Sequence, residues 1–203
     1  MLRFLPRFRR PELTRAPGNL TDAETRGPGL TPLFPSSDDL ALEIEAPNGK
    51  VLSTSDPALP GLIGGDQLSA SDLTIIRSDR AMADCRPLSL LATQTIDGIG
   101  RAVGLALDKR RFRENFYVDL NSAASFAEDA FVGRQLRIGP KLTIHILERD
   151  IRCRMISIDT EALDENPEIL RRVAKNHDGT AGVYAAVLVE GPVRPGYDIV
   201  LLD

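Results

Sequence analysis

Cysteine and histidine are scarce in this sequence, with two of each among 203 residues. Extracellular domains that rely on disulfides are rich in cysteine, so the two cysteines predict a protein of a reducing, cytoplasmic compartment. A structural zinc site needs four closely spaced cysteine or histidine ligands. Here these residues are scattered along the chain. The sequence therefore argues against a disulfide scaffold and against a zinc module.

Long apolar runs and an excess of positive charge are also lacking. No window approaches the ~18 apolar residues that a membrane-spanning helix needs. The basic start, residues 1–10, is not followed by the apolar stretch of a secretory signal. The net charge is −4, whereas nucleic-acid-binding domains usually carry a basic patch. We therefore expect no membrane and no nucleic-acid partner.

Proline and hydrophobic periodicity divide the chain into two parts. Residues 1–38 contain recurrent prolines, which disfavour helices and central strands. We interpret them as an extended Pro/Gly/Arg-rich arm that packs on the domain or makes a homodimer contact. Residues 39–203 are predicted to form one β-rich domain.

Short alternating segments and turn signals dominate the predicted domain. Apolar and polar residues alternate on both sides of Pro47-Asn48-Gly49, which predicts a hairpin. Helical spacing predicts a helix over 95–107, with Thr95 as its N-cap, and a second helix that begins at Asn166-Pro167. Many short strands with few helices predict a mainly β fold, a barrel or a sandwich.

A basic cluster follows the first predicted helix. In a strand, side chains alternate, so Arg111, Arg113 and Asn115 would lie on one face. Two guanidinium groups and an amide on one face suit a phosphate. The alternative is structural, because the helix dipole alone favours basic residues at a helix C-terminus.

Cys153 lies between two arginines, Arg152 and Arg154. Cationic neighbours favour the thiolate, which is the form that binds metals. A lone cysteine is more often a small buried apolar residue. It could also be a nucleophile, with His145 or His177 as its base.

Several ordered segments resemble the MOSC family, the domain named for the C-terminal part of molybdenum cofactor sulfurases. Arg86–Leu91 is similar to the family's Pro-Leu-Ser-Leu stretch, and Arg111–Asn115 is similar to its Arg-Phe-Arg-Pro-Asn. Val132–Gly139 is similar to its Gly-Arg-x-Leu-x-Ile-Gly run, and Arg152–Asp159 to the segment around its cysteine. The order and spacing hold from about Leu40 to the end of the chain.

The resemblance implies a MOSC-type β-barrel with a few peripheral helices that holds a molybdenum–molybdopterin cofactor (Moco). In enzymatic members, such as the mitochondrial amidoxime-reducing component, the last cysteine of the motif that matches Arg152–Asp159 binds the metal. That position is Cys153 here. The positions of Arg113 and Asn115 hold the pterin phosphate, and Arg111 joins them on the predicted face. Residues just before the Pro-Leu-Ser stretch also face the cofactor, namely Asp84, Cys85 and Arg86.

The implied activity is that of a molybdenum-dependent oxidoreductase that reduces small N-hydroxylated compounds. The chain has no flavin, haem or iron–sulfur motif, so electrons would come from a separate reductase. None of the 203 residues resembles the cysteine desulfurase domain that carries pyridoxal phosphate in the sulfurases. The alternatives are a non-catalytic sulfur carrier, with a persulfide on Cys153 and a sulfur-donor partner, and a barrel used only for assembly.

The sequence departs from the family pattern in several places, and two of these departures introduce an acid. Asp150 stands in place of the first cysteine of the family's Cys-x-x-Cys. Glu114 stands in place of the proline of its Arg-Phe-Arg-Pro-Asn. Glu114 would add a negative charge close to the proposed phosphate. Residues 39–80 are interpreted as a reduced remnant of the N-terminal β domain of the enzymatic members.

Overall fold

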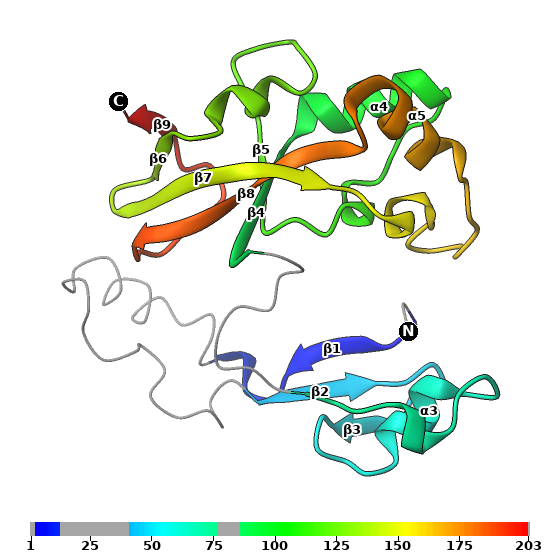
Figure 1. The fold of residues 1–203 in the computed structure, drawn as a ribbon. Helices are drawn as coiled ribbons and strands as arrows, with labels where there is room; N and C mark the ends of the chain where they lie inside the picture. The colour runs from blue at the N-terminus through cyan, green and yellow to red at the C-terminus, as the bar shows by residue number, and fades with distance from the viewer. Residues whose placement is uncertain (1–2, 13–40, 77–85, 203) are drawn as a thin grey trace. The chain divides into compact units, whose positions relative to one another are not determined.

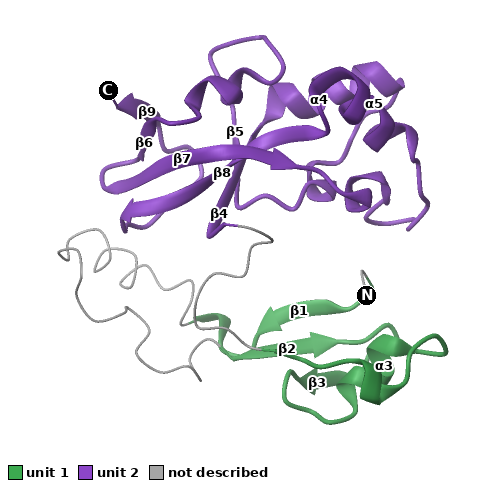
Figure 2. Ribbon diagram, viewed as in Figure 1, with its two compact units in different colours: residues 1–79 green, residues 80–203 purple. Residues whose placement is uncertain are grey.

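The computed structural model of the chain describes residues 3–12, 41–76 and 86–202 (Figure 1). The chain divides into two compact units, residues 1–79 and 80–203 (Figure 2). Each unit is described by itself below. Within the described ranges, no helix is both long enough and apolar enough to cross a membrane.

The first unit is built on a small antiparallel sheet with the spatial order β1-β2-β3. The strands span Leu5–Phe8 (β1), Leu42–Glu45 (β2) and Val51–Ser53 (β3). The predicted hairpin at Asn48-Gly49 is confirmed, and Gly49 has the positive φ of 78° that such a turn requires. Helix α3, Leu59–Gly64, follows the sheet.

Strand β1 lies inside the segment that we interpreted as an extended arm. It pairs along its length with β2, and Arg7 forms ion pairs of 3.6 Å with both Glu43 and Glu45. Proline is tolerated there because β1 is an edge strand. This part of the arm therefore pairs with the segment 39–80, which we interpreted as a remnant β domain, and the two compact units divide at residue 79. The rest of the arm, residues 13–38, lies outside the described residues.

The second unit is a curved sheet with the order β5-β4-β8-β7-β6-β9, an open half-barrel (Figure 1). The strands span Leu88–Ala92 (β4), Phe116–Val118 (β5), Gln135–Ile138 (β6), Leu142–Ile151 (β7), Thr180–Val189 (β8) and Ile199–Leu202 (β9). All neighbours are antiparallel except β4 and β5. The predicted mainly β fold is confirmed.

Two hydrophobic clusters hold the second unit together. The first lies against the sheet, where Leu136, Ile144 and Ile146 are fully buried. The second packs helices α4 (Thr93–Val103) and α5 (Glu168–His177) against the sheet. The two helices contact each other, so the buried faces of both are covered.

The beginning of α4 differs from the prediction, because Thr95 is not its N-cap. The helix begins at Thr93, and Thr95 is buried within its first turn. The Thr95 hydroxyl donates to a carboxylate oxygen of Glu128 at 2.8 Å and accepts from the backbone N–H of Phe126 at 2.6 Å. The second oxygen of Glu128 accepts from the Ala92 N–H at 3.4 Å. Glu128 therefore accepts from two donors at the junction of β4 and α4.

Glu128→Ala should lower the free energy of unfolding by about 1–3 kcal/mol, because it leaves the Thr95 hydroxyl and the Ala92 N–H buried without an acceptor. Urea denaturation of both proteins measures the difference. The double variant Thr95→Val/Glu128→Ala should lose less free energy of unfolding than the two single variants lose together, since both partners of one hydrogen bond are removed. Strict additivity would contradict this role of Glu128.

Candidate functional site

The basic segment after α4 forms a tight turn and then a loop, not the strand that the sequence predicted. Lys109–Arg111 is a 3-10 turn (η3), and β5 begins only at Phe116. Asp108 caps η3 by accepting from the backbone N–H of Arg110 at 2.8 Å. The geometric argument that Arg111, Arg113 and Asn115 share one face of a strand is therefore wrong.

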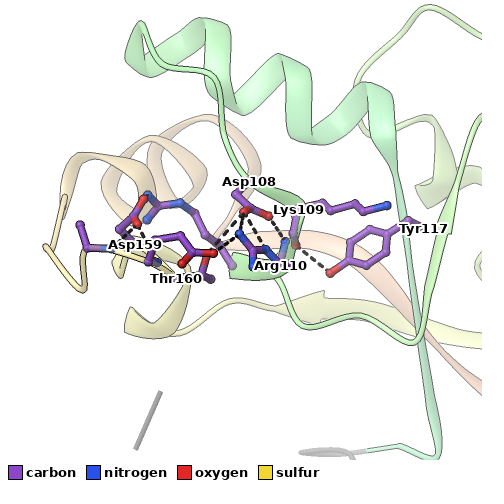
Figure 3. Close-up of polar contacts among 9 residues, drawn as sticks. Asp108, Lys109, Arg110, Tyr117, Asp159 and Thr160 are labelled. Atoms are coloured by element: carbon purple, nitrogen blue, oxygen red, sulfur yellow. Dashed lines mark hydrogen bonds and ion pairs between the residues drawn. The ribbon is translucent and has the colours of Figure 1, made fainter. Parts of the chain in front are cut away.

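Polar contacts fix this turn against its surroundings (Figure 3). The Arg110 guanidinium donates to Asp108, and this hydrogen bond holds the pKa of Asp108 at about 2. The Thr160 hydroxyl donates to the same carboxylate at 3.4 Å, and the Tyr117 hydroxyl donates to the Lys109 carbonyl at 2.7 Å. The turn is thus anchored both to the loop at residues 159–165 and to strand β5.

Arg111 points into the protein, and its side chain is only 10% exposed. One of its terminal nitrogens forms an ion pair with Asp159. Its Nε and its other terminal nitrogen are buried and have no hydrogen-bond partner among the described residues. Two unused buried donors on one guanidinium are uncommon, and they leave capacity for a bound water or anion.

Arg113 has a strained backbone and an open side chain. It has a φ of 60°, which few residues other than glycine adopt. The side chain is exposed and makes no hydrogen bond or ion pair with any residue that the structure describes. Strain of this kind is often retained at binding sites.

Asn115 fastens the same loop to the sheet. Its side-chain oxygen accepts from the backbone N–H of Ser89 at 2.9 Å and from the Ser89 hydroxyl at 3.3 Å. That oxygen is thus used structurally, and only the amide NH2 group could donate to an anion. Ser89 belongs to the Pro-Leu-Ser stretch, so two of the motifs are joined here.

Cys153 lies just beyond the end of β7, immediately before a 3-10 turn, Arg154–Ser157 (η5). Its thiol is free and exposed, which overrules the interpretation of Cys153 as a buried apolar residue. Both flanking arginines are paired with carboxylates. Arg154 makes a bidentate contact with Glu165, and Arg152 turns into the interior. Neither arginine therefore offers a free charge to the thiol, as the sequence argument had assumed.

Arg152 joins the Cys153 segment to the loop that carries Arg113. Its side chain is 8% exposed. One terminal nitrogen donates to the carbonyl of Phe112, and the other donates to Glu114 at 2.6 Å and to Asp150. Phe112 and Glu114 are the two chain neighbours of Arg113. One buried guanidinium thus holds both sides of Arg113 from the position next to Cys153.

Glu114 and Asp150 form a buried pair of acids around that guanidinium. Their side chains are 1% and 5% exposed. Burial raises the pKa of Glu114 to about 7, and the charge of Asp150 acts in the same direction. Burial likewise raises the pKa of Asp150. Two carboxyls facing one guanidinium therefore retain a proton well above the usual range, because a second buried negative charge has no counter-charge.

Glu114→Gln should change how stability depends on pH. In the unfolded chain Glu114 ionises near its usual value of 4.5, whereas in the folded chain it keeps its proton until pH about 7. Between these values the folded state binds more protons, so wild-type stability falls as pH rises through this window. The variant avoids that loss. Its free energy of unfolding should therefore rise by about 1–3 kcal/mol relative to wild type between pH 5 and pH 8.

Urea denaturation at several pH values measures this gain. Glu165→Gln is the matched control, because the hydrogen bond from Arg154 lowers the pKa of Glu165. Its stability difference from wild type should therefore stay flat between pH 5 and pH 8. A flat difference for Glu114→Gln as well would mean that Glu114 ionises as an ordinary surface acid.

The remaining predicted site residues fall in different places. Arg86 precedes β4 and forms an ion pair of 2.7 Å with Glu148 of β7. Asp84 and Cys85 lie outside the described residues.

The two histidines do not pair with Cys153. His177 forms a hydrogen bond with Asp129 at 2.8 Å and stacks on Phe126. Within the described part of the chain, neither His177 nor His145 forms a hydrogen bond with Cys153, so nothing supports the interpretation of Cys153 as a nucleophile with a histidine base. No group of three or more histidine, cysteine or acidic residues placed to hold a metal occurs in the described part of the chain.

Sequence reasoning missed the unit of Glu114, Asp150 and Arg152. The sequence did contain an indication of this unit, because both acids stand where the family pattern has an uncharged residue. The partner could not be identified from sequence, since Arg152 was interpreted as an activator of Cys153. Only the fold brings residues 114 and 152 together.

Comparison with known proteins identifies the family. A family model described as the MOSC domain matches residues 77–200. No curated protein matches the chain. Among solved structures, the chain is similar to YiiM from Geobacillus stearothermophilus, with 18% sequence identity and a TM-score of 0.46. The similarity covers 58% of this chain and 55% of the YiiM chain. Because the family model spans more than half of the residues, the chain belongs to the MOSC domain family.

Proposed function

We propose that this protein binds a molybdenum–molybdopterin cofactor beside the end of β7 and reduces small N-hydroxylated compounds. MOSC domains are usually associated with this cofactor. Cys153 would bind the metal, and Arg113 would bind the pterin phosphate. The cofactor, when bound, would supply the redox chemistry of molybdenum, and the protein would supply binding, orientation and electrostatics.

The observation that carries this proposal is the contact of Arg152 with both neighbours of Arg113. One cofactor has a phosphate at one end and metal-binding sulfurs at the other, so both protein contacts must lie within one molecule's length. Arg152 keeps the Arg113 loop within the reach of one arginine side chain from the residue next to Cys153. Both proposed contacts are exposed.

The donor chemistry also supports an anion at this site. Arg113 has an unused planar guanidinium, and Arg111 has buried nitrogens without partners among the described residues. The sequence suggested that Glu114 adds a negative charge close to the phosphate. That carboxyl does not oppose the anion, because it is buried against Arg152. Contacts from Asn115, Asp84, Cys85 and Arg86 remain part of the proposal. The cofactor's electrons would come from a separate reductase.

The test is expression in a host that makes the cofactor, followed by molybdenum and pterin analysis of the purified chain. The proposal would be supported by about one metal and one pterin per chain, together with reduction of an amidoxime by the protein when a chemical reductant supplies the electrons. A persulfide on Cys153 without metal would favour the sulfur carrier instead. If neither metal nor persulfide is found, the protein serves neither role.

Arg113→Ala should weaken cofactor retention, since a hydrogen bond between charged groups contributes about 1.5–3 kcal/mol. Arg113→Lys should restore part of the retention, because lysine keeps the charge but lacks the planar fork. The measurement is the pterin that remains after dialysis. Arg171→Ala, on α5, is the control for removal of an exposed arginine and should retain the cofactor. Equal retention by Arg113→Ala and wild type would remove Arg113 from the site.

A further inference from the structure

We propose that Arg152 is a positioning residue that sets the Arg113 loop beside Cys153, with Glu114 and Asp150 as its two buried acidic partners. The ligand roles of Arg113 and Cys153 rest on the proposed function, whereas their placement by Arg152 does not. The three residues act as one unit that replaces two uncharged positions of the family pattern.

The geometry of the Arg152 guanidinium suits it to hold several partners. Its planar fork donates in two directions at once, to the Phe112 carbonyl and to the carboxyls of Glu114 and Asp150. The aromatic ring of Phe112 lies 5.5 Å from the guanidinium carbon and is itself buried. A lysine ammonium could not reach the same partners with a fixed planar geometry. Arginine is therefore specifically suited to this position.

Contacts of Glu114 also help to hold the Arg113 backbone in its strained conformation. The Glu114 side chain is held by Arg152, and its backbone N–H donates to the Tyr117 hydroxyl at 3.1 Å. These contacts fix the residue that follows Arg113.

Charge and hydrogen bonding join the two segments. Burying an arginine without a counter-charge, or a carboxylate without one, raises the free energy of the folded state. Glu114 comes from the loop after η3, and Asp150 comes from β7, so the two acids that face Arg152 come from both segments that must be held together. Removing either side chain, rather than only its charge, would take away one of these two attachments.

The experiment uses the cofactor-free protein and two thiol reagents of different charge. Cys153 is reacted with 5,5′-dithiobis(2-nitrobenzoate), a dianion, and with neutral 4,4′-dithiodipyridine. The label at Cys153 is quantified by peptide mass spectrometry, so Cys85 can stay in place. The rate with the dianionic reagent is divided by the rate with the neutral reagent. This ratio rises with positive charge close to the thiol. Arg113→Gln should lower the ratio at least about threefold at low ionic strength, because it removes a nearby exposed charge.

The decisive variant is Glu114→Gln/Asp150→Asn/Arg152→Met, which removes the unit without leaving an unpaired buried charge. It should lower the ratio about as much as Arg113→Gln does, and adding Arg113→Gln to it should change little further. If this variant does not fold, Arg152→Lys replaces it and should lower the ratio by a smaller factor. Arg154→Gln is the control for loss of an arginine beside Cys153 that is already paired with a carboxylate.

Two results would overturn the inference. If Arg113→Gln leaves the ratio unchanged, Arg113 does not lie beside Cys153. If Arg113→Gln lowers the ratio but the folded triple variant, or Arg152→Lys in its place, does not, something other than Arg152 places the loop. Neither result involves metal, so a protein that binds no molybdenum can still confirm the positioning role.

Discussion

Cys153→Ser should purify with molybdenum at the background level of the host, whereas the wild-type chain carries it. Serine has nearly the same size but stays protonated at neutral pH, so it cannot replace a thiolate as a ligand for this metal. Cys153 is exposed and follows the last residues of β7, so the substitution should not disturb the core. The measurement is metal content per chain after gel filtration, with urea denaturation to show that the fold is retained.

The matched control is Arg154→Met, at the neighbouring position. Arg154 is 76% exposed and paired with Glu165, and no role in the site is assigned to it. Its metal content should equal that of wild type. Full molybdenum in Cys153→Ser would show that the cofactor is held without a protein thiolate. The proposed ligand would then be wrong even if the proposed cofactor were right.

Arg152→Met should destabilise the protein by about 3–5 kcal/mol, the usual consequence of leaving buried charges without their partner. Two carboxyls would then face each other with no counter-charge, and both are already largely buried. The loss should be greater at pH 8 than at pH 5, because protonation of the acids relieves the repulsion. Urea denaturation at both pH values provides the measurement.

Two comparisons separate charge from packing in this result. Arg154→Met breaks a surface ion pair and should cost at most about 1 kcal/mol. Glu114→Gln/Asp150→Asn/Arg152→Met removes all three charges and should recover much of the stability that Arg152→Met loses. If the triple variant is as unstable as Arg152→Met, the side chain stabilises the fold by packing rather than by charge.

The fold class could be predicted from sequence because its signals are local. Alternating side chains in β6 and β7, the Asn48-Gly49 turn and the helix that begins after Pro167 all follow from backbone preferences. The pairing of β1 with β2 could not be predicted in the same way. Its partner lies more than thirty residues away in sequence, and Pro6 within β1 argues against a strand.

The candidates for the proposed site could be chosen from the linear sequence, whereas the contacts of each candidate were visible only in the tertiary structure. The ordered motifs pointed to Arg113, Asn115 and Cys153 as candidates, since motif spacing is visible in a linear chain. Local spacing could not show that η3 replaces the expected strand, or that Asn115 is used to fasten the loop to Ser89. It also could not show that Arg152 turns away from Cys153 and toward two acids. Hydrogen bonds and ion pairs depend on distance in space, and only the folded chain brings residues 112, 114 and 150 around one guanidinium.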